Sequence, residues 1–156
     1  MSPQSARPLF AAPLLLLAGA APAPPLSPGA WRFTNTPVSA TLDGRVLHDL
    51  PVGEITSETT CLTPEMAMQP AAWLARDLVH DCTLDQTSVA AGRVAITGHC
   101  PPQGAAFPPG RLTIAGTYTA GSYDLTFTTV SPDENGTMGF NGRMTGSLTG
   151  PCKPGE

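Results

Sequence analysis

The sequence predicts a mainly β domain, either a curved antiparallel meander or a small barrel-like sheet, with one short helical segment at about residues 63–79. Three observations support this fold class. Apolar and polar residues alternate with a period of two over most of the chain after residue 29, as in strands with one buried face. Turn-forming residues recur at close intervals. Four cysteines follow an N-terminus typical of exported proteins, in which disulfides form.

The first 20 residues have the build of a secretory signal peptide. Arg7 precedes an apolar run from Leu9 to Ala18, and small residues continue to Ala20. The run is shorter than the about 20 apolar residues that span a bilayer. We therefore expect cleavage after Ala20, a secreted protein in the periplasm of a Gram-negative bacterium, and no membrane span after cleavage.

Three segments follow the signal peptide: a proline-rich leader at residues 21–28, a single disulfide-stapled domain at 29–152, and a tail at 153–156. The domain is of ordinary size for one hydrophobic core. The whole chain has 8 basic and 12 acidic residues, a formal net charge of −4. This mild acidity with few basic side chains argues against a nucleic-acid-binding surface and against docking on anionic lipid.

The domain opens with strand signals. Trp31 and Phe33 alternate with polar neighbours, which predicts a first strand. Val38–Leu42 and Arg45–Leu47 then flank Asp43-Gly44, a pair typical of a tight hairpin turn.

A threonine-rich extended segment, Glu54–Cys61, leads into the expected helix. Thr63–Glu65 is a helix start, because it offers an N-cap, then a proline at the first helical position, then an acid beside the positive end of the dipole. Pro70 interrupts or restarts the helix. Ala71–Val79 places its large apolar residues on one side, as a short helix packed on a sheet does.

After Cys82 the alternation returns and predicts strands separated by turns and one loop. The loop is residues 101–110, where several prolines exclude a ladder. A dense turn signal lies at Ser131–Gly136. The predicted strands are Leu84–Val89, Arg93–Cys100, Leu112–Tyr118, Tyr123–Thr128 and a last strand or strand pair that carries Met138, Phe140, Met144 and Leu148 on one face.

The four cysteines allow three pairings. Cys82 and Cys100 lie at equal distances from residue 91, the centre of a predicted turn at 90–92, so partner numbers in this hairpin would sum to 182. Directly opposed residues have Cβ atoms about 4.5–5.5 Å apart, close to disulfide distance. We therefore predict a Cys82–Cys100 disulfide, which leaves Cys61 to pair with Cys152.

Two sets of side chains could ligate a metal. One surrounds the predicted hairpin and consists of His80, Cys82, His99 and Cys100. The other offers soft thioether ligands to copper and consists of Met66, Met68, Met138 and Met144. Strand alternation points His99 away from Cys100, oxidation pairs the thiols first, and methionines more often fill gaps in cores. We expect no metal and no cofactor.

No motif indicates catalysis. The chain has no Gly-x-Ser-x-Gly nucleophile elbow. The adjacent pairs His48-Asp49 and His80-Asp81 do not orient one another as a catalytic dyad requires. We therefore expect no catalytic residues.

Five aromatic residues could line a pocket for an apolar ligand inside the curled sheet. They are Trp31, Tyr118, Tyr123, Phe127 and Phe140. The chain has only nine aromatic residues with which to build any core, so the sequence favours the simpler interpretation that these side chains are the core.

Several short motifs resemble one family, the exported bacterial proteins grouped as domain of unknown function 3617. The motifs are Pro28-Gly-Ala-Trp31, Cys61-Leu-Thr-Pro-Glu65, Asp81-Cys82, the strand that ends at Cys100, and Gly150-x-Cys152. They cover nearly all of residues 28–152. Ala30 and Arg32 depart from the usual Leu and Glu, and the usual basic residue before the last Gly-x-Cys is missing. The resemblance implies an exported β-rich domain with two disulfides and carries no activity, substrate or catalytic residue.

The sequence therefore predicts an exported, non-catalytic β-rich domain that binds an apolar or envelope-derived ligand in the concave face of its sheet. Two alternatives stay open. A structural or protein–protein interaction module of the envelope would show an exposed apolar patch and no cavity. An envelope hydrolase or metal-binding protein would show polar groups that converge in one cleft. The expected partner is an apolar small molecule or an envelope protein, and not a nucleic acid.

Overall fold

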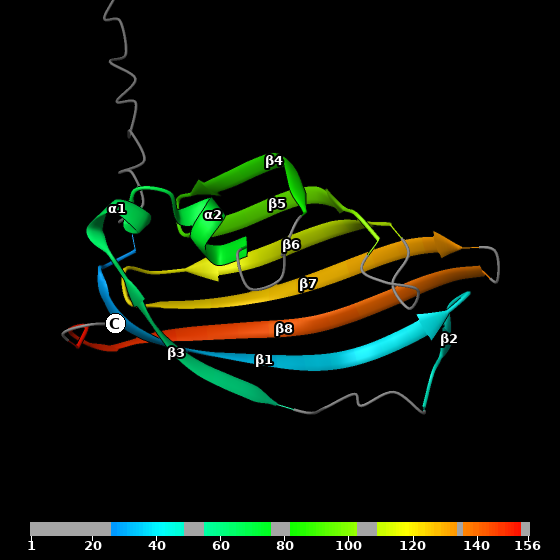
Figure 1. Cartoon of the computed structure of the whole chain (residues 1–156), viewed down its shortest axis with the longest axis horizontal. Helices are drawn as coiled ribbons and strands as arrows, with labels where there is room; N and C mark the ends of the chain where they lie inside the picture. Colours follow the sequence, from blue (N-terminus) through cyan, green and yellow to red (C-terminus); the bar gives the residue numbers. More distant parts are fainter. Residues whose placement is uncertain (1–25, 49–54, 76–81, 103–108, 134–135, 154–156) are drawn as a thin grey trace, which may run out of the picture.

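The computed structural model describes residues 26–48, 55–75, 82–102, 109–133 and 136–153 (Figure 1). The strands are β1 (Gly29–Leu42), β2 (Arg45–Val46), β3 (Thr56–Leu62), β4 (Thr83–Ala90), β5 (Arg93–Cys100), β6 (Gly110–Tyr118), β7 (Ser122–Asp133) and β8 (Gly136–Gly150), and the helices are α1 (Pro64–Ala67) and α2 (Pro70–Ala75). These eight strands form one antiparallel sheet in the order β2-β1-β8-β7-β6-β5-β4, and β3 also pairs with β1. The predicted fold class is confirmed, as an open curved sheet and not a closed barrel.

The predicted helical segment is two short helices. The Thr63 hydroxyl accepts a hydrogen bond from the Met66 amide at 3.3 Å and caps α1, whose first residue is Pro64. Pro70 begins α2. Because proline cannot continue the hydrogen-bond ladder of a helix, the chain restarts there. The predicted helix is described as far as Ala75, and its remaining residues lie outside the described ranges.

The first strand is longer than predicted. The two strand segments predicted at its ends form one 14-residue strand, β1. Its pairing with β8 shifts by one residue between Pro37 and Ser39, so Val38 forms a β-bulge and is 60% exposed. The bulge interrupts the alternation of apolar and polar residues, which is why the sequence separates the two segments.

The last hairpin also extends farther than predicted. β7 runs through Pro132 to Asp133 and pairs with β8, although the dense turn signal begins at Ser131. Strand residues therefore occupy part of the predicted turn. The ladder between β6 and β7 ends at Val130. At Pro132, β7 is therefore paired with β8 on one edge and has no β6 partner on the other. A proline is tolerated at such a position.

The β4–β5 hairpin follows a register different from the predicted one. Ala91 and Gly92, with φ angles of 50° and 73°, form a two-residue turn, so Val89 pairs with Val94 and the partner numbers sum to 183. A bulge between Leu84 and Gln86 absorbs the extra residue, Asp85. The sum of 182 holds only at the end of the hairpin near the cysteines, where Thr83 pairs with His99.

Two disulfides join the pairs that the sequence predicts. Cys82 and Cys100 close the open end of the β4–β5 hairpin, with Cα atoms 4.0 Å apart. Cys61, in β3, is bonded to Cys152, two residues beyond β8. Because β1 lies between β3 and β8, this second disulfide holds together the two strands that flank the start of β1.

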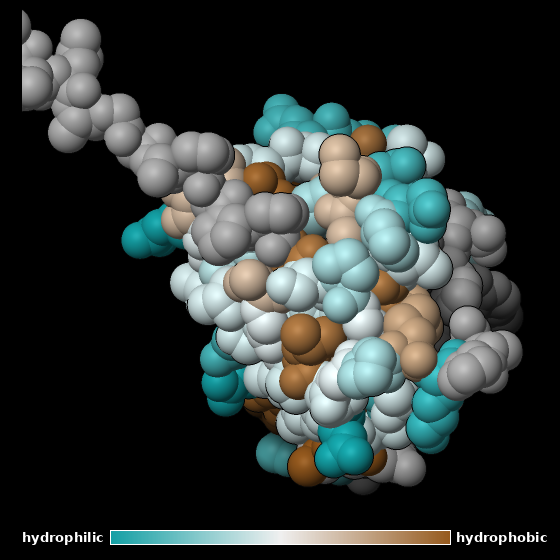
Figure 2. All heavy atoms as spheres, turned by 90° about the vertical axis from the view of Figure 1, so that its left-hand side faces the viewer, coloured by the Kyte–Doolittle hydropathy of each residue, from teal (hydrophilic) through white to brown (hydrophobic). Residues whose placement is uncertain are grey.

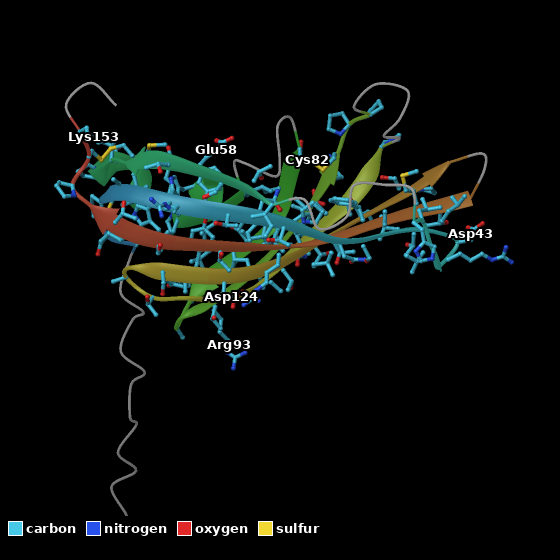
Figure 3. All side chains as sticks on the ribbon, turned by 90° about the horizontal axis from the view of Figure 1, so that it is seen from below. Asp43, Glu58, Cys82, Arg93, Asp124 and Lys153 are labelled. Carbon is cyan, nitrogen blue, oxygen red and sulfur yellow. A yellow bond between two sulfur atoms is a disulfide. The ribbon has the colours of Figure 1, made fainter. Side chains whose placement is uncertain are left out.

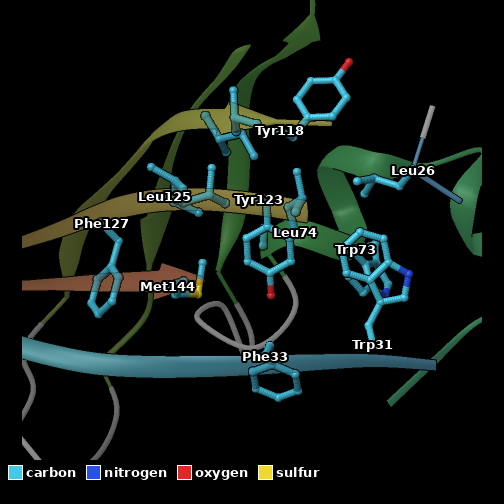
Figure 4. Packing of buried hydrophobic residues seen from close by; sticks show 14 of the residues in the cluster. Leu26, Trp31, Phe33, Trp73, Leu74, Tyr118, Tyr123, Leu125, Phe127 and Met144 are labelled. Carbon is cyan, nitrogen blue, oxygen red and sulfur yellow. The ribbon is translucent and has the colours of Figure 1, made fainter. Parts of the chain in front are cut away.

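The hydrophobic core fills the concave face of the sheet, and α1 and α2 lie over one end of that face (Figures 1 and 4). The largest fully buried side chains are Trp31, Leu26, Leu62, Ile96, Leu112, Ile114 and Leu125. The convex face carries exposed polar residues, among them Arg93 and Asp124 (Figure 3). Within the described residues, neither helix has the length and apolar character that crossing a membrane requires.

Candidate functional sites

The five aromatic residues predicted to line a ligand pocket lie in or against the core. Trp31, Tyr118, Tyr123 and Phe127 are each at most 7% exposed, and Phe140 is partly buried against the same cluster. Four of them form two ring contacts. Trp31 stacks on Tyr123 with ring centroids 5.9 Å apart, and Phe127 lies 5.9 Å from Phe140.

Trp73 of α2 completes the first aromatic group. Its ring centroid lies 5.2 Å from that of Trp31 and 5.8 Å from that of Tyr123, both in edge-to-face geometry (Figure 4). The sequence places Trp73 on the buried side of a helix but gives no sign that it joins residues from β1 and β7. Offset and edge-to-face arrangements are the favourable ones for aromatic rings, so this trio attaches the helical segment to the sheet.

A first pocket, of about 290 Å³, opens beside this trio. Residues of α1, of α2 and of the link between them line it: Glu65, Met66, Gln69, Ala72 and Trp73. Its surface is mainly apolar. The buried Trp73 therefore connects the pocket with Trp31 and Tyr123 behind it. Figure 2 faces this end of the molecule and shows apolar surface among polar residues.

Among the described residues that line this pocket, only Glu65 is charged. The pKa of Glu65 lies below its usual value, because the carboxylate accepts a hydrogen bond from a backbone amide and another from the Thr63 hydroxyl. Both bonds favour the ionised form. The pocket thus combines a thioether, an indole face and one anion at its edge.

A second pocket, of about 450 Å³, lies at the far end of β5 and β6 from the β4–β5 turn. Its surface is almost entirely apolar, although two basic residues are among those that line it: His99, Cys100, Pro109, Gly110, Arg111, Val130, Pro132 and Thr137. His99 Nδ1 lies 2.8 Å from Asp85 Oδ1. Asp85 is the bulge residue of β4, and a bulge can redirect a side chain in this way.

Sequence reasoning missed this second pocket. Strand alternation points His99 away from Cys100, and its side chain is 61% exposed. Asp85 gives no signal, because the pair depends on an extra residue in β4 that alternation does not reveal. Arg111 directly faces His99 across β5 and β6, which follows only from the observed register.

The described residues among the predicted metal ligands do not form one cluster. Cys82 and Cys100 are bonded to each other. Met66 and Met68 lie at α1, whereas Met144 is 2% exposed in the core of the sheet and Met138 pairs with Leu42 near the opposite end of β8. His80, a predicted ligand of the first set, lies outside the described residues. So do Asp49 and Asp81 of the two His-Asp pairs considered for catalysis. Within the described ranges, no group of three His, Cys, Asp or Glu side chains is placed to hold an ion.

One comparison with known proteins gave a match. The model of a family described as "Protein of unknown function (DUF3617)" matches residues 26–152, which covers the whole predicted domain. Searches of curated proteins and of solved structures found no match.

Proposed function

This chain belongs to the DUF3617 family of proteins of unknown function, and we propose that it is an exported, non-catalytic domain that binds an apolar or envelope-derived ligand. The binding site in this proposal is the pocket between α1 and α2. It differs from the site expected on the concave face, because Trp31 and Tyr123 lie behind Trp73 and contribute to the pocket only through it.

The observation that carries the proposal is the mainly apolar pocket that adjoins a packed aromatic cluster. Its volume of about 290 Å³ is near the lower end of the range of small-molecule sites, about 300–1,000 Å³. Met66 stands at its wall with 39% of its surface exposed, and a flexible thioether adapts to ligands of different shape. The rigid floor formed by Trp73 and the adaptable wall formed by Met66 suit an apolar body more than a polar one.

Export is the second part of the proposal, and the two disulfides support it. All four cysteines are paired, and disulfides persist in oxidising compartments. The full chain expressed in a Gram-negative host should be found in the periplasm, with a mature N-terminus at Ala21 and no free thiol. N-terminal sequencing and thiol labelling measure both. A cytoplasmic product with free thiols would refute this part.

Ligand binding is tested with N-phenyl-1-naphthylamine, a fluorescent apolar probe. Trp73 lines the pocket and contacts Trp31, the other tryptophan of the chain. Excitation of these indoles should therefore transfer energy to a bound probe. The disulfide-bonded protein should show saturable transfer. Native mass spectrometry of the same preparation reports any ligand already bound in the periplasm.

Two methionines provide a matched pair of variants. Met66 lines the pocket, whereas Met68 is 81% exposed and is not among the residues that line it. Met66→Glu places a charge in the pocket and should weaken probe binding about tenfold or more, since burying an unpaired charge is costly. Met68→Glu changes the net charge equally and should bind the probe as the parent chain does. Equal affinity of both variants would exclude the pocket as the site.

An interaction module is the second candidate, and one observation favours it. Val38, Val46 and Ile55 are each more than half exposed. Val38 lies in β1, Val46 in β2 and Ile55 directly before β3. Because β2 and β3 both pair with the same edge of β1, the three residues lie along that edge. A photo-crosslinking residue at position 38 should then capture an envelope protein in the periplasm, and the same residue at position 68 should not.

A further inference from the structure

We propose that the second pocket binds an organic carboxylate with an apolar body, and that Arg111 and His99 hold the carboxylate while Val130 and Pro132 contact the body. This proposal is independent of the apolar site between the helices. It rests on the register of three strands, on the bulge in β4 and on the lining of the pocket.

Strand register brings together the two basic side chains. His99 of β5 and Arg111 of β6 are directly opposed, and Arg111 is in turn opposed to Val130 of β7. Side chains of opposed residues lie on the same face with Cβ atoms about 4.5–5.5 Å apart. One row across three strands thus presents an imidazole, a guanidinium and an isopropyl group, and all three line the pocket.

The bulge holds the imidazole in place. Asp85, the extra residue of β4, engages Nδ1 of His99 at 2.8 Å. This contact leaves Nε2 for a ligand. Arg111 supplies a permanent positive charge at the site.

Arg111 is available to bind an anion. Among the described residues it takes part in no ion pair or side-chain hydrogen bond, in contrast to Arg143, which binds Asp124 through two nitrogens. A free guanidinium favours a planar carboxylate that accepts two parallel hydrogen bonds. Thr137, also in the lining, adds a hydroxyl donor.

The rest of the lining sets the class of ligand. Val130 is 39% exposed, and Pro109 and Pro132 stand beside it. A bare inorganic anion would leave these apolar surfaces in water, whereas a molecule with a hydrocarbon body covers them. A volume of about 450 Å³ is within the range of small-molecule sites. An amphiphilic carboxylate therefore covers the apolar surface with its body and places its charged group beside Arg111 and His99.

The test uses sodium octanoate as the probe and ¹⁵N–¹H NMR of the disulfide-bonded protein as the readout. Octanoate should shift the amides of His99, Arg111 and Val130 in a saturable way. Acetate, which lacks the body, and octanol, which lacks the charge, should each bind at least about tenfold more weakly, because charged hydrogen bonds and apolar burial both contribute. Shifts at Met66 and Ala72 would instead report the pocket between the helices.

Arg111→Gln should weaken octanoate and acetate binding about tenfold or more each and leave octanol binding little changed. Arg93→Gln is the matched control, because Arg93 is an exposed arginine at the opposite end of the same β5 strand (Figure 3). Asp85→Asn should weaken binding less than Arg111→Gln, since Asp85 only positions His99. The proposal is overturned if octanol binds as tightly as octanoate, if both arginine variants lose affinity equally, or if the shifts appear only at Met66 and Ala72.

Discussion

The ring of Tyr123 lies against Gly146, its partner across β7 and β8. A Cβ atom placed on Gly146 would stand 2.1 Å from Cε1 of Tyr123. Phe127 has the same relationship to Gly142, at 2.2 Å from ring atom Cζ. Gly142 and Gly146 therefore make space for aromatic rings on the concave face, and the ring of Tyr123 packs against Trp31 and Trp73 there.

Replacing Gly146 should disturb this packing. Gly146→Ala forces the buried Tyr123 ring away from Trp31, and overpacking of this kind costs about 1–3 kcal/mol in the free energy of unfolding. Urea denaturation followed by tryptophan fluorescence measures the change. Gly121→Ala is the control, because its nearest neighbour would be Cβ of Leu148 at 3.9 Å. A loss of stability in both variants, or in neither, would contradict the proposed role of Gly146.

The two disulfides should contribute unequally to stability. Cys61 and Cys152 are separated by 91 residues, and Cys82 and Cys100 by 18. Under the loop-entropy model, the paired substitution of Cys61 and Cys152 by serine lowers the free energy of unfolding by about 4–5 kcal/mol, and that of Cys82 and Cys100 by about 3 kcal/mol. Thermal unfolding of both double variants at one pH checks the order. The reverse order would show that the short bridge does more than restrict the unfolded chain.

Asp43 should stabilise the hairpin turn and its contact with β8. Its amide donates to the Thr137 carbonyl at 2.9 Å, and its carboxylate accepts from the Thr137 amide at 2.8 Å. Asp43 also has a φ of 49°, which alanine adopts poorly. Asp43→Ala should therefore lose about 1–3 kcal/mol, and Asp43→Asn clearly less, because asparagine keeps an acceptor and tolerates positive φ. Equal losses by chemical denaturation would contradict this account.

The ion pair between Asp124 and Arg143 should give stability a small dependence on pH. The hydrogen bonds from Arg143 lower the pKa of Asp124 below its usual value. A lowered folded-state pKa adds stability above the unfolded-state pKa of about 3.9, and this stability is lost as the pH falls through the folded-state value.

Asp124→Asn should accordingly cost at most about 1 kcal/mol at pH 7, because both side chains are solvent-exposed. The difference from the parent chain should vanish in acid, and salt should reduce it at neutral pH. Urea titrations at neutral and acid pH measure this. A difference that persists below the pKa of the carboxyl would mean that the charge of Asp124 is not its source.

Local patterns in the sequence determined much of the fold, because they act over a few residues. Alternation marks the strands, Asp43-Gly44 closes a hairpin, and Thr63 with Pro64 starts a helix. The disulfide between Cys82 and Cys100 also follows from local symmetry. The register used to predict it holds only beyond the bulge, so the pairing is right while part of the hairpin is displaced by one residue.

The tertiary structure alone decided which side chains from distant strands meet at the candidate sites. Trp73 meets Trp31 and Tyr123 because α2 lies over the end of the sheet. Asp85 meets His99 because a single extra residue shifts the register of β4, and alternation carries no record of such a residue. The sequence by itself determined which segments are strands and which cysteines pair. Long-range strand register decided which side chains of β5, β6 and β7 share the second pocket, and the bulge in β4 decided that Asp85 meets His99.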